Sequence, residues 1–235
     1  MAVPEAVAGL AAIPGVRTAA QLAELSLESS ASAGSLPLAP ALAELAPGGL
    51  RRGSSVSVAG STALVFALLA EATREGSWAV IAGMPDVGVA AAAELGVELE
   101  RLALVPDPGA EVAAVLSALI DGFDLVVLGR AVARGMSPQL ARRLMGRVRN
   151  RGAVLLAAGP LPGADLELRV SKRRWRGIDD DGFGHLEFRD VIATSCGRGA
   201  AARSRNVPLR LPDGGGAVTS VVEASASRCL SEVAG

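Results

Sequence analysis

Tyrosine is absent from this sequence of 235 residues, and aromatic residues make up only 3% of it, although half of it is hydrophobic. The core must therefore be built from Ala, Val, Leu and Ile side chains. The two cysteines, Cys196 and Cys229, and the one histidine, His185, lack the spacing of metal ligands. We expect no metal site, and without a Gly-x-Ser-x-Gly segment we expect no hydrolytic triad.

Long hydrophobic runs are also missing. The stretch from Ala63 to Ala70 is among the longest, and it is too short to span a bilayer. The first residues show no basic segment followed by an apolar run, so we expect no signal peptide. Two cysteines outside a secretory context are typical of reduced thiols. We therefore predict a cytoplasmic protein that does not contact the membrane.

From Pro47 onward, short apolar runs alternate with helical patterns. The patterns carry boundary signals, such as Gly76 after one helix and Ser137-Pro138 before another. Continuous apolar strands separated by helices predict a parallel sheet that helices cover on both faces. We expect strands at 55–59, 78–82, 102–105, 124–128 and 153–158, and helices at 61–74, 87–95, 111–120 and 137–149.

The pattern changes after Gly163. Residues 165–170 and 185–192 alternate polar and apolar side chains, which indicates antiparallel strands, and residues 171–181 between them read as a hairpin tip. The predicted fold class is thus α/β, with a three-layer core, a mostly parallel sheet and antiparallel strands near the C-terminal end.

Both flanks of the core are predicted to be flexible arms. Residues 1–28 are expected to form a helical arm, residues 29–46 a linker rich in Ser, Ala, Gly and Pro, residues 47–194 the core, and residues 195–235 a tail. A sparse apolar stripe suggests a final helix that docks a partner by helix-in-groove binding, although it could equally fold back onto the core. The stripe consists of Val218, Val221, Val222, Leu230 and Val233.

A phosphate-binding site is missing where a nucleotide-hydrolysing α/β protein would carry it. The first strand and first helix are joined only by Ala59-Gly60-Ser61-Thr62, which is too short to surround a triphosphate. The single lysine, Lys172, lies more than a hundred residues away. The fourth strand should end in an acid that orients Mg²⁺, but Gly129 and Arg130 follow it. We interpret residues 59–62 as a tight turn with a serine cap, and we expect no cofactor.

Several segments resemble the core of the RecA recombinase in their order and spacing over roughly residues 45 to 160. They are Leu45–Gly53 followed by a strand and a helix that ends Thr73–Gly76, then Ala93–Val97, Leu102–Gly109 and Gly122–Leu128. The segments Pro160–Leu166 and Arg173–Ile178 are similar to those of one subgroup. This subgroup is the actinobacterial ImuA-prime type, a RecA-like accessory protein of inducible mutagenesis.

This resemblance implies a function in DNA metabolism. It implies partnership with ImuB, an inactive Y-family polymerase-like protein, and indirectly with an error-prone DnaE-type polymerase. It places the lost lysine near Ser61 and the two DNA-binding loops near residues 130–138 and 159–165, both short here. We therefore expect a non-enzymatic adaptor in translesion synthesis at the nucleoid. Two alternatives are an atypical ATP-dependent DNA-binding paralogue of RecA and a damage-induced inhibitor of cell division.

Positive charge is concentrated in one part of the chain. Residues 130–176 hold twelve basic and two acidic residues, whereas the rest holds eleven basic and twenty-two acidic ones. This asymmetry suggests a surface that faces a polyanion, although part of it could be one solvated helix face at Arg142, Arg143, Arg147 and Arg149.

An aromatic residue within a cationic cluster can stack on a base while arginines contact phosphates. The alternative is that Trp175 packs onto the sheet and the arginines stay solvated. In a strand, Arg173 and Trp175 would share one face and Arg174 and Arg176 the other. The candidate contacts to single-stranded DNA are Arg130, Arg134, Lys172, Arg173, Arg174, Trp175 and Arg176.

Overall fold

A computed structural model describes residues 34–179, 181–197 and 204–221. The chain divides into two units, Met1–Ser35 and Leu36–Gly235, and the main sheet and its helices belong to the second. The predicted helical arm at 1–28 lies outside the described residues.

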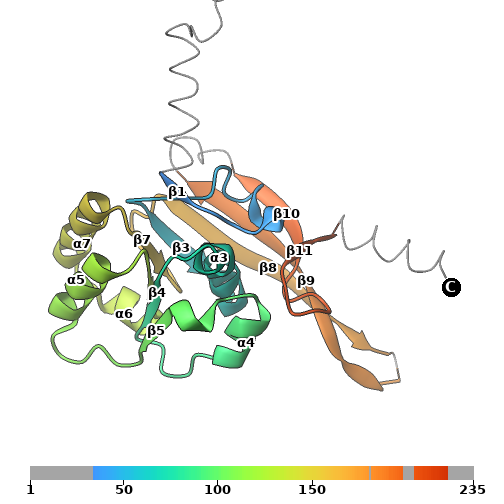
Figure 1. Ribbon diagram of the computed structural model, residues 1–235. Coiled ribbons are helices and arrows are strands. Elements are labelled where there is room, and N and C mark those ends of the chain that lie inside the picture. The colour runs from blue at the N-terminus through green and yellow to red at the C-terminus, as the bar shows by residue number, and fades with distance from the viewer. Residues whose placement is uncertain (1–33, 180, 198–203, 222–235) are drawn as a thin grey trace, which may run out of the picture. The chain divides into compact units, whose positions relative to one another are not determined.

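The second unit is built on one large sheet that is parallel over most of its width (Figure 1). The strand order is β5-β4-β6-β7-β3-β8-β9-β10-β11. The strands from β5 to β8 pair in parallel, and those from β8 to β11 pair antiparallel. They are β3 (Ser55–Ala59), β4 (Ala79–Ala82), β5 (Leu102–Val105), β6 (Leu125–Leu128), β7 (Val154–Ala157), β8 (Leu166–Ile178), β9 (Gly184–Gly197), β10 (Arg205–Arg210) and β11 (Thr219–Ser220).

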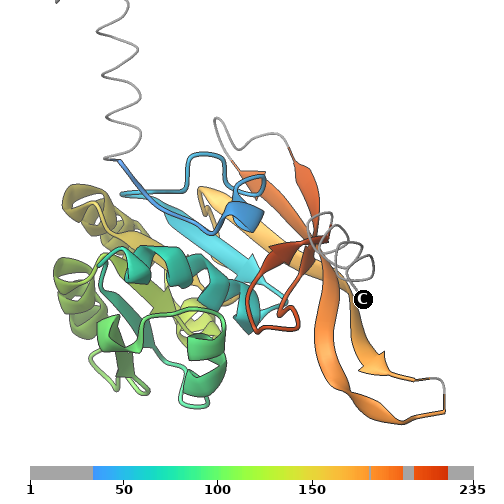
Figure 2. The ribbon, with the colours of Figure 1, turned by 45° about the vertical axis from the view of Figure 1, so that its right-hand side comes forward.

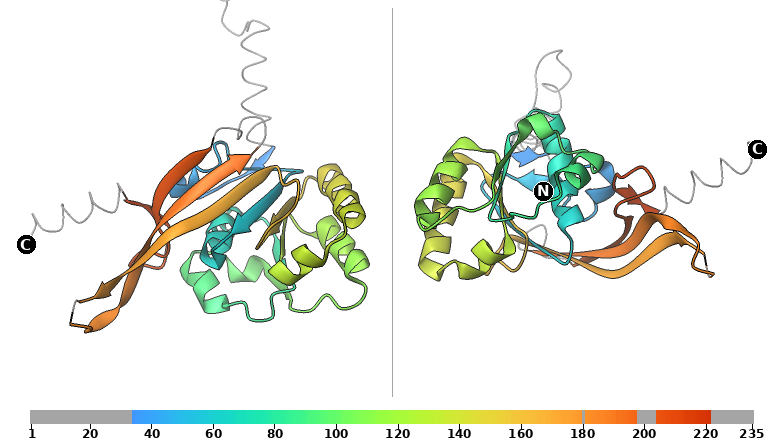
Figure 3. Two further views of the ribbon diagram at one scale, coloured as in Figure 1. Left: turned by 180° about the vertical axis from the view of Figure 1, so that it is seen from behind. Right: turned by 90° about the horizontal axis from the view of Figure 1, so that it is seen from below.

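Helices cover both faces of the parallel part, with α3 and α4 on one side and α5, α6 and α7 on the other (Figure 3). The predicted three-layer α/β fold class is therefore confirmed. Within the described residues, no helix has the length and apolar character that crossing a membrane requires. The helices are α3 (Thr62–Arg74), α4 (Val89–Glu94), α5 (Val112–Gly122), α6 (Arg130–Gly135) and α7 (Pro138–Arg151), with the 3-10 turns η1 (Pro40–Leu42) and η2 (Leu99–Arg101) and a small sheet of β1 (Ser35–Leu36) and β2 (Leu50–Arg51).

The central strands are buried on both faces, which explains why their sequences are continuously apolar. Val126 and Val127 are adjacent on β6 and fully buried. Val126 belongs to the hydrophobic cluster beneath α5 and α7, and Val127 to the cluster beneath α3. Successive strand residues point to opposite faces, so each layer of helices receives every second side chain.

The C-terminal antiparallel strands predicted at 165–170 and 185–192 are confirmed, and they are longer than predicted. Residues 171–178, which were expected in a hairpin tip, continue β8 instead. The pairing shifts between Ser171 and Arg174, where Lys172 adopts a left-handed φ of 46°. The outer half of the β8–β9 hairpin consequently runs past the end of β3 and projects from the helices (Figure 2).

Two flanking segments are more ordered than the sequence indicated. Leu36, Leu42 and Leu45, within the predicted linker 29–46, are buried in the core cluster. In the predicted tail, β10 pairs with β9, and Val207 and Leu209 are buried. In both cases a few large apolar side chains pack against the core, although the surrounding composition is typical of a linker or tail.

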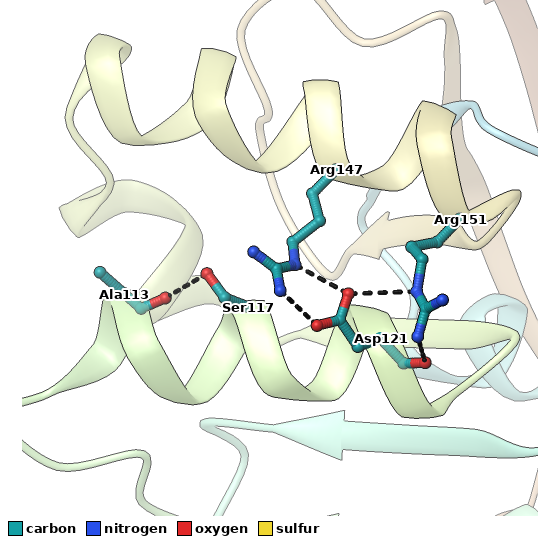
Figure 4. A network of polar contacts seen from close by, with 5 residues as sticks. All are labelled: Ala113, Ser117, Asp121, Arg147 and Arg151. Carbon is teal, nitrogen blue, oxygen red and sulfur yellow. Dashed lines mark hydrogen bonds and ion pairs between the residues drawn. The ribbon is translucent and has the colours of Figure 1, made fainter.

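A polar network joins α5 to α7 on the surface (Figure 4). The Asp121 carboxylate accepts a hydrogen bond of 2.7 Å from Arg147 Nε, pairs again with Arg147 Nη2, and lies 3.2 Å from Arg151 Nε. Arg151 Nη2 also donates to the Asp121 carbonyl oxygen over 2.9 Å. The hydrogen bond from Arg147, aided by the charges of both arginines, lowers the pKa of Asp121. Two of the basic side chains of α7 are thus partly neutralised.

We expect Asp121→Asn to lower the melting temperature at neutral pH but not in acid. The carboxyl pKa is depressed in the folded state, so its stabilising effect is present above about pH 4 and is lost as the pH falls through the folded pKa. Thermal melts of both proteins between neutral pH and pH 3 test this. A difference in melting temperature that persists unchanged in acid would contradict it.

Candidate functional site

The turn between β3 and α3 is closed by a side chain and by a neighbouring strand. Ala59 ends β3 and Thr62 begins α3, with Gly60 and Ser61 between them. Ser61 Oγ accepts a hydrogen bond of 3.2 Å from the Leu64 amide and so caps the helix, as the sequence predicted. Gly60 has φ 91°, and a Cβ there would lie 2.7 Å from the carbonyl oxygen of Val170 on β8. The turn therefore leaves no loop to surround phosphate groups.

The position after β6, where a metal-binding acid is expected, is blocked by backbone. Gly129 is buried, its amide donates to the Ala82 carbonyl oxygen over 2.7 Å, and a Cβ on it would overlap the carbonyl oxygen of Gly83. A Cβ on Gly83 would in turn overlap Val132 of α6. The short helix α6, which the sequence did not predict, thus packs over the carboxyl ends of β4 and β6. This packing leaves no space for an acidic side chain at Gly129.

An open cavity of about 610 Å³ lies at this same edge of the sheet. Val112, Val132, Met136 and Leu140 contribute to its mainly apolar wall, and Asp107 is the one charged residue among the described residues that line it. A triphosphate requires cationic side chains or a row of backbone amides. The cavity therefore does not suit a nucleotide phosphate chain.

Beyond the end of β3, three side chains come together on the face of the hairpin that carries α3. Trp175 of β8 lies directly opposite Arg189 of β9, so the two share a face. Arg173 also lies on this face, because its Nη2 atom would be 3.1 Å from a Cβ on Gly60. Arg173 and Trp175 share a face as predicted, and both are exposed.

Arg189 was not predicted, and it connects this cluster to the turn. Its Nε donates to the Leu211 carbonyl oxygen over 2.8 Å, and its Nη2 donates to Ser61 Oγ over 3.3 Å. The guanidinium lies 5.3 Å from the centre of the Trp175 ring. Burial and the nearby positive charge of Arg173 lower the pKa of Arg189. No sequence signal could reveal this contact, because it depends on the register of β9 against β8.

The other predicted contacts are distributed elsewhere. Arg174 and Arg176 lie on the opposite face of the hairpin, opposite Asp190 and Phe188. Arg176 lies 3.5 Å from the Asp190 carboxylate, which Arg210 also contacts at 3.2 Å. Lys172 occupies the bulge of β8 and is exposed.

Two predicted contacts, Arg130 and Arg134, lie on α6. Arg130 packs against Gly159 in the loop that follows β7, where a Cβ on Gly159 would lie 3.3 Å from Arg130 Cγ. Arg134 is exposed in the last turn of this helix. The structure therefore brings together Arg173 and Trp175, but not all seven predicted residues.

The predicted docking stripe is only partly described. Val218 is half-buried against the core cluster, which favours the alternative that this part folds back. Val221 is the last described residue, and Val222, Leu230 and Val233 lie outside the described residues. Docking by the stripe therefore stays a prediction.

The fold and site define a three-layer α/β protein in which the turn after the first core strand carries no phosphate-binding loop. The family model of the MT3502 N-terminal domain matches residues 44–163, about half of the chain. The uncharacterized protein Rv3395c of Mycobacterium tuberculosis is 37% identical over 153 residues, which cover 61% of this chain and 74% of that protein. The chain belongs to the MT3502 N-terminal domain family.

Proposed function

We propose that this protein is a non-catalytic, RecA-like adaptor of the ImuA-prime type that acts in DNA-damage-induced mutagenesis. The observation that carries the proposal is the obstruction of the two positions at the carboxyl edge of the sheet where phosphate and metal would bind. Gly129 is in backbone contact with Gly83, and Gly60-Ser61 forms a capped turn. A nucleotide-binding type of fold that retains its sheet but has no room for phosphate at the first turn or for an acid after β6 is suited to holding partners rather than to hydrolysis.

The order of the RecA-like segments supports the RecA-like part of the proposal. These segments run from Leu45 to Leu128, and the family match at 44–163 spans all of them. The MT3502 family match does not by itself name a function, so the assignment to the ImuA-prime type depends on the sequence resemblance. That resemblance also supplies the partners, an ImuB-like inactive Y-family protein and, through it, an error-prone DnaE-type polymerase. We place the protein in the cytoplasm, at the nucleoid.

Genetic and binding experiments in the encoding organism test the proposal together. Deleting the gene should strongly reduce damage-induced mutation while leaving survival of undamaged cells unchanged. The tagged full-length protein, isolated from damaged cells, should co-purify the Y-family-like partner. Normal damage-induced mutation in the deletion strain would overturn the proposal. Filamentous cells on expression without damage, combined with normal mutation, would instead favour the inhibitor of cell division.

The docking stripe offers a sharper version of the binding experiment. Leu230→Asp in the full-length chain should reduce co-purification of the partner if the stripe docks it, because a charge would enter an apolar contact. Val218→Ala is the matched control, since Val218 packs on this protein's own core. If the Leu230→Asp protein co-purifies the partner fully, the contact lies outside the stripe, and the adaptor proposal itself is not affected.

A further inference from the structure

We propose that Arg173, Trp175 and Arg189 form a binding site for single-stranded DNA, in which the two arginines hold a backbone phosphate and Trp175 stacks on the adjacent base. The inference deepens the proposed function by naming a ligand, and it rests on that function for the choice of DNA rather than RNA. The three side chains lie on one face of the β8–β9 hairpin, beside the turn that joins β3 to α3.

The first argument is uncompensated positive charge. Within the described residues, neither Arg173 nor Arg189 forms an ion pair with a carboxylate, whereas Arg174 and Arg176 are placed on the face that carries Asp190. The charges of Arg173 and Arg189 oppose each other, and part of the Arg189 guanidinium is removed from water. An anion placed between them relieves this repulsion. Phosphate is one of the two anions, with carboxylate, whose geometry guanidinium groups match through paired N–H donors, and the proposed function in DNA metabolism selects phosphate.

The second argument is that Arg189 is already held in position. Its bonds to the Leu211 carbonyl oxygen and to Ser61 Oγ use two donor directions and fix the plane of the guanidinium. A guanidinium has five N–H donors, so others are left for a ligand. A side chain that is ordered before binding loses little conformational entropy when the phosphate arrives. Arg173 is exposed and can move to contact the same phosphate.

The third argument selects a single strand. Trp175 is 44% exposed, although Arg189 lies over its ring at 5.3 Å, so part of the aromatic surface is open to solvent. An unpaired base can stack there, whereas the bases of a duplex are already stacked and present only their edges.

Charge also indicates the path of the strand. The hairpin tip carries Asp179, Asp181 and Glu187, which are exposed and would repel phosphates. In the other direction, Lys172 lies in the bulge of β8, and Arg130 packs on Gly159 after β7, which pairs with β3. The single-stranded DNA would therefore run from Trp175 toward the core, along the carboxyl edge of the sheet. A free nucleoside triphosphate is disfavoured, because the turn at Gly60-Ser61 provides no cradle for further phosphates.

Arg173→Gln and Arg174→Gln provide a matched test, because they are neighbours that remove the same charge from opposite faces. We would measure fluorescence anisotropy of a labelled oligothymidine of about 20 nucleotides with the full-length protein at several salt concentrations. Arg173→Gln should weaken binding about tenfold and reduce the slope of log affinity against log salt by about one, because one phosphate contact is lost. Arg174→Gln should change affinity by less than about threefold, the effect of long-range charge alone. Equal losses from both variants would overturn the proposal.

Intrinsic fluorescence tests the base contact separately. The chain has two tryptophans, so Trp78→Phe leaves Trp175 as the one reporter. The oligonucleotide should quench its emission, and Trp175→Ala should weaken binding about tenfold, in keeping with one lost stacking contact. Arg189→Lys keeps the charge but not the planar fork, and it should also weaken binding. Binding without quenching would refute the stacking contact.

Three further results would contradict the inference: no oligonucleotide binding at low salt, equal binding of a duplex of the same length, or stronger displacement by ADP than by unlabelled oligothymidine. Failure here is distinguishable from failure of the adaptor proposal. If the deletion strain loses damage-induced mutation but the purified protein does not bind oligothymidine, the adaptor proposal is retained and the proposed DNA site is wrong.

Discussion

Replacing Gly129 with alanine should lower the free energy of unfolding by about 3 kcal/mol, the upper part of the range for overpacking a close-packed interior. The added Cβ would overlap the carbonyl oxygen of Gly83. Because that neighbour is backbone rather than the flexible end of a side chain, relief requires β4 and β6 to move apart at their carboxyl ends. The same movement would strain the hydrogen bond that the Gly129 amide donates to the Ala82 carbonyl oxygen.

Gly146→Ala is the control for this substitution. Gly146 lies inside α7 and has no atom within 4 Å of a built Cβ, so alanine should stabilise the protein by up to about 1 kcal/mol through helix propensity. Urea unfolding of the three proteins provides the comparison. A Gly129→Ala protein as stable as the parent would mean that the carboxyl edge is open enough to accept a side chain.

Val126→Asp should destabilise the protein by several kcal/mol and leave little folded material. Val126 is fully buried on a strand whose neighbours β4 and β7 are also buried, so the carboxylate would have neither water nor a counter-ion. Leu104→Asp on the outermost strand β5 is the matched control, because Leu104 is 39% exposed. Thermal melts followed by circular dichroism compare the melting temperatures of both variants with that of the parent. A Val126→Asp protein that is soluble and melts normally would refute the central position of β6.

The parallel core was predictable because burial on both faces leaves a strong signal. The runs Ser55–Ala59 and Leu102–Val105 form strands with the predicted bounds. In contrast, α6 was not predicted, because six residues with a glycine at each border show no helical period. The outer half of β8 was read as a hairpin tip because its pattern is broken at the bulge, and because pairing with β9 rather than burial makes it a strand.

The candidate site was partly predictable for similar reasons. A strand places Arg173 and Trp175 on one face whatever it pairs with, and this prediction is confirmed. The contribution of Arg189 depends on strand register, and the obstruction of Gly129, which follows β6, depends on Gly83, which follows β4. Both are tertiary contacts between distant segments, which a local pattern does not encode.

Titration calorimetry with Mg-ATP is the most direct test of the central claim that the fold has lost its nucleotide site. The experiment uses the full-length protein at high concentration, with Mg-ADP and a Ser61→Ala variant titrated alongside. We predict no saturable heat for either nucleotide. The Ser61→Ala protein should lose about 1 kcal/mol of stability with its helix cap, and it also loses the hydrogen bond from Arg189 Nη2. Micromolar binding of Mg-ATP that becomes weaker in the Ser61→Ala variant would contradict the absence of a nucleotide site.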